Sequence, residues 1–307
     1  MSSQWRILDF TSFEGKIHSD DGAIVVVNSD GVSQRVSVAD VAVVLIGMKV
    51  SFSAGVIHRL TDKDIAVLFC DWRGVPESGA FSWSEHTRVG ARHKAQLELS
   101  LPRRKNAWGR IVRSKIQGQA AVLRNLNRPG AQELERIAGQ VRSGDPSNLE
   151  GQAARIYWSK FSDTLGKRTP GIGALFGPNS CLDYGYAILR GHGIRAVLAA
   201  GLGPANGVFH RGRSNMFNLV DDLIEPFRPC IDEIAMFLPA DATPSDRSVK
   251  KRLVAAAMQT FNDDGSVPRV LLDLAQQYGR YVEGDIEKLP VPSWQGPSAL
   301  NTDLKNA

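Results

Sequence analysis

The chain has 307 residues, of which 43% are hydrophobic and 22% are charged, with 37 Lys and Arg against 32 Asp and Glu. This balance is typical of a folded globular protein and excludes disorder along the whole chain. At roughly 150 residues per domain, the length predicts two domains.

The cysteines, Cys70, Cys181 and Cys230, are scattered and lack C-x-x-C spacing, which argues against a disulfide framework and a thiolate zinc site. The N-terminal sequence MSSQWRILDF lacks the basic start and apolar run of a signal peptide. The longest apolar stretch, residues 41–47, is too short to cross a bilayer. We therefore expect a soluble, cytoplasmic protein with no membrane partner.

Residues 1–75 are expected to form a small N-terminal β-domain. Asp-Gly turns at 20–22 and 29–31 separate runs rich in Val and Ile, at spacings that suit antiparallel strands. The expected strands cover Trp5–Phe10, Ala23–Val27, Val32–Val38 and Ile65–Cys70. Three consecutive valines at 25–27 predict a strand that is covered on both faces. Residues 76–95, where the strand pattern is lost, are expected to form a linker.

Residues 96–288 are expected to form a larger, mainly α-helical catalytic domain, so the predicted fold class is α+β. The apolar residues Leu134, Ile137, Ala138 and Val141 have the spacing of an amphipathic helix. Similar patterns predict helices at residues 155–161, 182–189, 249–261 and 270–281. The segment 289–307 contains three prolines and little apolar content, and is expected to be a flexible tail.

Positive charge is concentrated between Arg88 and Arg128, where Glu98 is the only acidic residue. A DNA backbone favours such a surface, because each neutralised phosphate releases counterions. The alternative interpretation is a solvated helical face that has no ligand.

Glu150 and His210 each have a structural and a chemical interpretation. Ser147 and Glu150 fit the Ser-x-x-Glu capping box, in which the Glu side chain reaches back to the N-cap amide. His210 follows the glycine-rich residues 201–207, whose backbone can aim a side chain along an unusual path. A single histidine is nevertheless more often an ordinary packed or surface residue.

Asp221, Asp222 and Glu225 form an acidic cluster directly before Pro226. On a helix, residues three or four apart share a face, where carboxylates repel each other unless a cation lies among them. Pro226 is expected to kink the helix beside Glu225. The cluster is either a solvent-facing acidic stripe or part of a metal site.

Two or more carboxylates and one neutral imidazole suit Mg²⁺ or Mn²⁺. Beside a surface that binds DNA, such an ion would polarise a phosphate and stabilise the developing negative charge. The residues alone therefore indicate a metal-dependent nucleic-acid enzyme.

Four motifs occur in a fixed order along the chain: EGQAARIYW at 150–158, NSCLDYGYAILRG at 179–191, GLGPANGVFH at 201–210 and DLIEPFRP at 222–229. Together they resemble the CRISPR-associated integrase of spacer acquisition (CRISPR-associated protein one). The length and the form of the last two motifs resemble the type II lineage. Asn218-Leu219, where relatives often carry Ser-Leu, and the additional charge of Asp221 depart from the pattern.

The resemblance implies a homodimer in which the β-domain dimerises and binds DNA ends. It assigns Glu150, His210 and Glu225 as catalytic metal ligands, with Asp222 and Asn179 supporting them, and leaves open whether Asp221 or Asp222 touches the metal. The residues expected to contact DNA are Arg103, Arg104, Lys105, Arg110, Arg113, Lys115, Arg155, Arg211 and Arg213.

In this family, a short DNA fragment is joined to the repeat of a CRISPR array. The 3′-hydroxyl of the fragment attacks a target phosphodiester, so the reaction needs no protein nucleophile. The implied partners are DNA, the small CRISPR-associated protein two in a heterohexamer, for which the tail is a candidate docking segment, and the type II effector nuclease. A structure-specific nuclease, in which water attacks, and a DNA-binding scaffold without catalysis are the alternatives.

Overall fold

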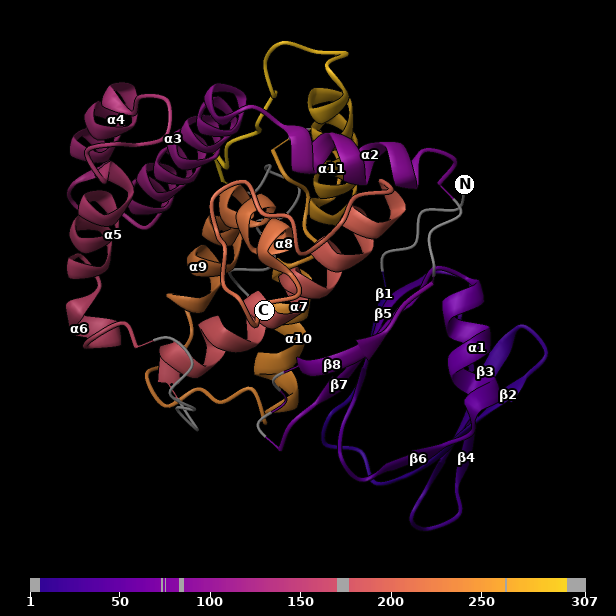
Figure 1. Cartoon of the computed structure of the whole chain (residues 1–307). Helices are drawn as coiled ribbons and strands as arrows, with labels where there is room; N and C mark the ends of the chain where they lie inside the picture. Colours follow the sequence, from indigo (N-terminus) through magenta and orange to yellow (C-terminus); the bar gives the residue numbers. More distant parts are fainter. Residues whose placement is uncertain are drawn as a thin grey trace. The chain divides into compact units, whose positions relative to one another are not determined.

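The computed structural model describes residues 6–72, 74, 76–82, 86–169, 177–262 and 264–296. The chain divides into two units, Met1–Ser84 and Glu85–Ala307 (Figure 1). The first unit is rich in strands and the second is mainly helical, which confirms the predicted α+β fold class. Within the described ranges, every helix is too short or too polar to cross a bilayer.

The described part of the first unit contains two four-stranded sheets, in the strand orders β1-β5-β7-β8 and β4-β3-β2-β6. The elements are β1 (Arg6–Phe10), β2 (Gly15–Asp20), β3 (Ala23–Asn28), β4 (Ser33–Ser37), β5 (Val41–Ile46), β6 (Val50–Phe52), α1 (Ala54–Asp62), β7 (Ala66–Cys70) and β8 (Pro76–Ala80). Ile24 of β3, Val44 of β5 and Leu60 of α1 are fully buried in one hydrophobic cluster.

The strand pairing is partly parallel, so the purely antiparallel expectation is wrong. β2, β3 and β4 do pair antiparallel through the predicted Asp-Gly turns. However, β5 pairs parallel with both β1 and β7. Between β1 and β5 the chain forms three strands of the other sheet, and between β5 and β7 it forms β6 and α1. Parallel neighbours require such long crossover connections. The strand buried along its whole length is β5, whereas Val25 and Val27 of β3 are only half-buried.

The second unit is built around two long helices, α3 and α7. Its elements are α2 (Val89–Glu98), α3 (Leu101–Asn125), α4 (Ala131–Gln140), α5 (Leu149–Ser159), α6 (Ser162–Leu165), α7 (Gly177–Ala199), α8 (Asn218–Leu223), the 3₁₀ turn η1 (Glu225–Phe227), α9 (Arg228–Ala235), α10 (Arg247–Ala256) and α11 (Val267–Glu283). Helix α3 contacts α4, α5, η1 and α9, while α7 contacts α8, α9, α10 and α11. The segment from α8 to α9 therefore lies between the two long helices.

Two features fix the segment from α8 to α9. Pro226 interrupts the helix as predicted, so that α8 ends at Leu223 and a 3₁₀ turn precedes α9. In α7, a Cβ at Gly185 would lie 2.4 Å from Ile231, a distance that only glycine allows. The close approach brings α9 against α7 and holds the end of η1 in the interior.

The structure corrects the expected linker at residues 76–95. β8 pairs with β7 within the first unit, and α2 begins at Val89 in the second unit. β8 contains Pro76 and Gly79 because it lies at the edge of its sheet, where strands tolerate both residues.

The flexible-tail expectation is wrong for residues 289–296, which we term the C-terminal strap. Leu289 and Trp294 are fully buried. The indole N–H of Trp294 donates to Glu233 Oε2 at 2.9 Å, and the hydroxyl of Ser114 on α3 donates to the carbonyl of Pro292. The prolines restrict the backbone of the strap without preventing burial. Residues 297–307 of the expected tail lie outside the described residues.

Candidate functional site

Glu150 stands in the first turn of α5, and of its two interpretations the capping box with Ser147 is wrong. The N-cap is Asn148, with a φ of 48°, whose side chain accepts a hydrogen bond from the amide of Gly151 at 3.2 Å. Asp145 accepts from the amides of Leu149 and Glu150, both at 2.9 Å. Because these two side chains cap the helix, the Glu150 carboxylate is available for other contacts.

His210 is aimed by its glycine-containing loop, by Asp222 and by Trp108. A Cβ at Gly207 would lie 2.3 Å from the His210 carbonyl oxygen, so only glycine permits this loop path. Asp222 is fully buried, and its Oδ1 lies 2.6 Å from His210 Nδ1. The Trp108 indole packs edge-to-face on the imidazole at 5.9 Å. Since Nδ1 faces a carboxylate, Nε2 is left to bind a ligand.

Charge around the imidazole changes its proton affinity. The hydrogen bond that His210 donates to Asp222 raises the pKa of His210, burial opposes this rise, and the negative charges of Glu225 and Glu150 add to it. Burial also raises the pKa of Asp222, although His210 and the Phe209 amide stabilise its carboxylate. The three residues assigned as ligands are thus close enough to act on one another electrostatically.

Glu225 lies in η1 and is ionised despite being buried. Its Oε1 accepts from Arg228 Nε at 2.9 Å, and its Oε2 lies 2.7 Å from Lys115 Nζ. Burial opposes ionisation, but Arg228 and Lys115 together lower the pKa of Glu225 to about 2. Lys115 also donates to Glu150 Oε1 at 2.6 Å, so one ammonium group bridges the two carboxylates.

The donor types at this site suit a hard divalent cation. Glu150 and Glu225 supply carboxylate oxygens, and His210 supplies an imidazole whose other nitrogen is held by Asp222. In the arrangement seen, Lys115 lies between the carboxylates, and no three His, Cys, Asp or Glu side chains of the described residues are grouped as a metal would require. The chemistry of the donors fits such an ion, and Lys115 occupies the space between the two carboxylates.

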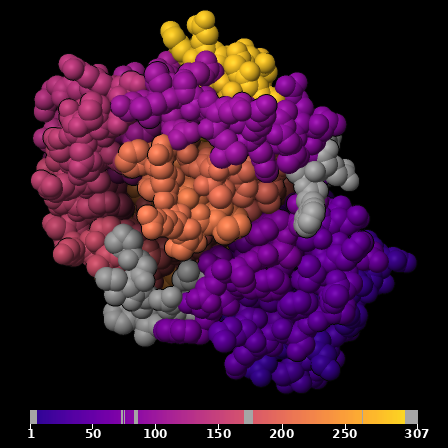
Figure 2. All heavy atoms as spheres, in the orientation of Figure 1, coloured from indigo at the N-terminus to yellow at the C-terminus, as the bar shows by residue number. Residues whose placement is uncertain are grey.

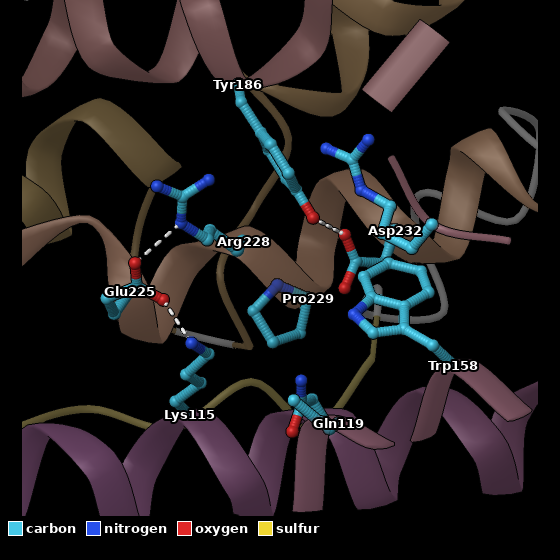
Figure 3. Close-up of a pocket in the computed structure, with 10 residues that line it drawn as sticks. Lys115, Gln119, Trp158, Tyr186, Glu225, Arg228, Pro229 and Asp232 are labelled. Carbon is cyan, nitrogen blue, oxygen red and sulfur yellow. Dashed lines mark hydrogen bonds and ion pairs between the residues drawn. The ribbon is translucent and has the colours of Figure 1, made fainter. Parts of the chain in front are cut away.

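A cavity of about 280 Å³ opens beside Glu225 (Figure 3). Lys115 and Gln119 rise from α3 and face Glu225, Arg228 and Asp232 across it. Its lining is mostly basic, aromatic and amide-bearing: Lys115, Gln119, Ala154, Trp158, Arg168, Tyr186, Glu225, Arg228, Pro229 and Asp232. Positive charge next to aromatic rings suits the phosphates and bases of a nucleic acid.

Asp232, on the lining of the cavity, belongs to a cluster that the sequence does not predict. Asp232 Oδ2 accepts from the Tyr157 hydroxyl at 3.0 Å, and Oδ1 accepts from the Tyr186 hydroxyl. The Arg228 guanidinium lies 4.5 Å from the centre of the Tyr186 ring. Arg228 could have been selected from the motif DLIEPFRP, but no sequence signal points to Asp232 or to Arg168.

Asp221 and Asn179 form hydrogen bonds with residues other than Glu150, His210 and Glu225. The carboxylate of Asp221 accepts from Arg190 Nε at 2.8 Å and from the Asn215 amide at 2.7 Å, which ties down the loop before α8. Asn179 Oδ1 accepts from Arg168 Nη1 at 2.9 Å. Asn179 therefore acts on the cavity through Arg168, and Asp222 is the acidic residue that contacts His210.

Comparison with known proteins identifies the family. The family model described as "CRISPR associated protein Cas1" matches residues 10–242. The CRISPR-associated endonuclease Cas1 of Neisseria meningitidis is 33% identical over 238 residues, which cover 75% of this chain and 76% of that protein. The chain belongs to the Cas1 family. A Cas1 endonuclease of Francisella tularensis is 30% identical and covers 68% of this chain and 71% of its own length.

Solved structures share the Cas1 fold along most of the chain. A casposase bound to an integration product superposes with a TM-score of 0.77 at 18% identity, covering 98% of this chain and 97% of that one. A Cas1 protein from Thermotoga maritima gives a TM-score of 0.76 at 16% identity, covering 93% of this chain and 99% of that one. A chain of a Cas6-RT-Cas1–Cas2 complex superposes with a TM-score of 0.76 at 20% identity, covering 97% of this chain and 37% of that one.

The basic residues that the Cas1 resemblance assigns to DNA occupy three kinds of position. Those with exposed side chains are Lys105, Arg113, Arg155, Arg211 and Arg213, and those partly buried on α3 are Arg103, Arg104 and Arg110. Arg103 donates to the carbonyls of Tyr281 and Ile286, so part of its role is structural. Lys115 lies inside the site. The loop after α7, which carries Arg211 and Arg213, belongs to the orange part of the surface in Figure 2.

Proposed function

We propose that this member of the Cas1 family is the integrase of CRISPR spacer acquisition. The 3′-hydroxyl of a short DNA fragment attacks a phosphodiester of the repeat, and the 3′-oxygen of the target strand leaves. The observation that supports the proposal is that Glu150 and Glu225 share Lys115 and that the charges of both carboxylates act on His210, beside a cavity whose lining includes Arg168 and Arg228. The relatives are named endonucleases, and one structural neighbour is a casposase with an integration product.

Each residue has a definite task in this proposal. Glu150, Glu225 and the Nε2 of His210 would hold Mg²⁺ or Mn²⁺, which would supply polarisation of the scissile phosphate. Asp222 keeps the proton of His210 on Nδ1. Arg228 and Arg168, on the lining of the cavity, attract the phosphate backbone and help to position the attacking strand.

Lineage and assembly belong to the same proposal. The form of GLGPANGVFH and DLIEPFRP supports a type II system in the cytoplasm, with the type II effector nuclease as a further partner. We propose a homodimer that binds a small Cas2-like protein, since one structural neighbour is a complex of Cas1 with Cas2. Size-exclusion chromatography with light scattering, with and without that protein, measures both assemblies, and a monomer that does not bind it contradicts this part.

The reaction is tested with a branched DNA that resembles the integrated product, in Mn²⁺ or Mg²⁺. We expect the wild type to rejoin the target strand. The rate for His210→Ala should be at least about a hundredfold lower, because the variant lacks a group that orients the reacting atoms. His58→Ala, at an exposed histidine of the first unit, is the matched control.

Each alternative gives a different result in this assay. Hydrolysis without rejoining would favour a structure-specific nuclease. Binding without any reaction, with the Cas2-like protein added, would favour a scaffold. Rejoining that His210→Ala leaves unchanged would contradict the assigned site.

A further inference from the structure

Lys115 lies between two carboxylates, the buried Glu225 and the partly buried Glu150, where a positive charge is needed. Its Nζ is 2.6 Å from Glu150 Oε1 and 2.7 Å from Glu225 Oε2, so those oxygens are at most about 5.3 Å apart. The side chains of Lys115, Glu150 and Glu225 are 15%, 22% and 7% exposed. At this separation and burial, two carboxylates repel each other strongly unless a cation lies between them.

Arg228 does not replace Lys115 in this role. Its Nε contacts Glu225 Oε1, the other oxygen of that carboxylate, at 2.9 Å. Within the described part of the chain, Lys115 is the cation that contacts both Glu150 and Glu225. The relative position of the two carboxylates therefore depends on one flexible side chain.

A divalent cation would compete with Lys115 for the same oxygens. The ion would add two positive charges within a few ångströms of the ammonium group, so Lys115 could not keep both contacts. The cavity gives the side chain room to turn, because Lys115 is part of its lining next to Glu225 (Figure 3).

We propose that Lys115 is a positioning residue: it holds Glu150 and Glu225 together while the site is free of metal, and it releases both carboxylates when a divalent cation binds. The inference rests on the proposed metal site. Removal of the Lys115 charge then has two opposite effects. The metal-free protein becomes less stable, and the affinity for metal increases.

The test is thermal unfolding of the full chain in EDTA and across a Mn²⁺ titration, with Lys105→Met as the matched control at an exposed lysine of the same helix. In EDTA, we expect Lys115→Met to lower the Tm by roughly 5 °C or more, because a broken buried pair is strongly destabilising. We expect its Kd for Mn²⁺, obtained from the rise in Tm with concentration, to be on the order of tenfold lower than that of the wild type. The control should match the wild type in both measurements.

A double variant separates charge repulsion from a general folding defect. Lys115→Met with Glu150→Gln removes the repulsion together with the lysine, so its Tm in EDTA should return towards that of the wild type. If Lys115→Met does not fold, the proposal requires that the double variant fold, and an unfolded double variant overturns it. A wild-type Kd for Mn²⁺ in Lys115→Met also overturns it. A wild type that binds no Mn²⁺ is a separate result, which overturns the metal site itself.

Discussion

Asp232 on α9 is a buried carboxylate whose charge lowers the stability of the folded protein. Burial raises its pKa from the ordinary 3.8 to about 6, against the opposing hydrogen bonds from Tyr186 and Tyr157. At 1.36 kcal/mol for each pH unit, this difference corresponds to about 3 kcal/mol for the ionised group at neutral pH. Replacing the charge by a neutral group of the same shape should recover much of this free energy.

The pH dependence follows from the direction of the shift. The pKa of Asp232 is higher in the folded than in the unfolded state, so the folded protein binds more protons between about pH 4 and pH 6. Its contribution to the free energy of unfolding therefore falls as the pH rises through that window, and the penalty is complete above it. In Asp232→Asn, the amide accepts from one tyrosine hydroxyl and donates to the other, so both hydrogen bonds persist.

We expect Asp232→Asn to increase the free energy of unfolding by up to about 3 kcal/mol at pH 7.5 and to change it little at pH 4. Urea unfolding at both pH values measures this, with Asp285→Asn as the control at an exposed aspartate. Equal effects of Asp232→Asn at the two pH values would refute the reasoning. Since Asp232 lines the cavity beside Arg228, we also expect the stabilised variant to join DNA more slowly, as is common when a costly charge serves function.

Two further substitutions test other contacts. Asp222→Asn should lower the pKa of His210, because the carboxylate raises it, and an unchanged pKa in an NMR titration of the imidazole would contradict this. The same substitution should weaken Mn²⁺ binding by about 10- to 100-fold, which calorimetry measures. Trp294→Ala should decrease the free energy of unfolding by about 3–5 kcal/mol, because the ring is fully buried and its N–H is bonded to Glu233. A loss below about 1 kcal/mol in urea unfolding would show that the C-terminal strap is not part of the core.

Features set by neighbouring residues could be predicted from the sequence. The Asp-Gly turns marked the hairpins of β2, β3 and β4, and Pro226 marked the break before α9, because both effects act within a few residues. The parallel pairing of β5 could not be predicted, since its partners are distant in sequence and depend on the path of the crossovers.

The position of Lys115 shows why charge alone does not predict a role. The family resemblance assigns it to the DNA surface with its basic neighbours, but it faces inward while Arg113 is exposed two residues earlier on the same helix. Trp294 was missed for a related reason, because a single aromatic residue among prolines gives no periodic pattern. At the start of α5, Ser147 fitted the sequence rule, but the left-handed backbone at Asn148 moved the cap by one residue.

The 3₁₀ turn at Glu225–Phe227 determines the angle at which Arg228 leaves the backbone. In an α-helix, side chains three residues apart differ by about 60° around the axis, whereas in a 3₁₀ turn they eclipse each other. Arg228 is therefore placed directly above Glu225, with its guanidinium also over the ring of Tyr186. In an uninterrupted α-helix the side chain of Arg228 would be offset from that of Glu225 by about 60° around the axis. Pro226 thus sets the direction of a positive charge, although its own side chain carries none.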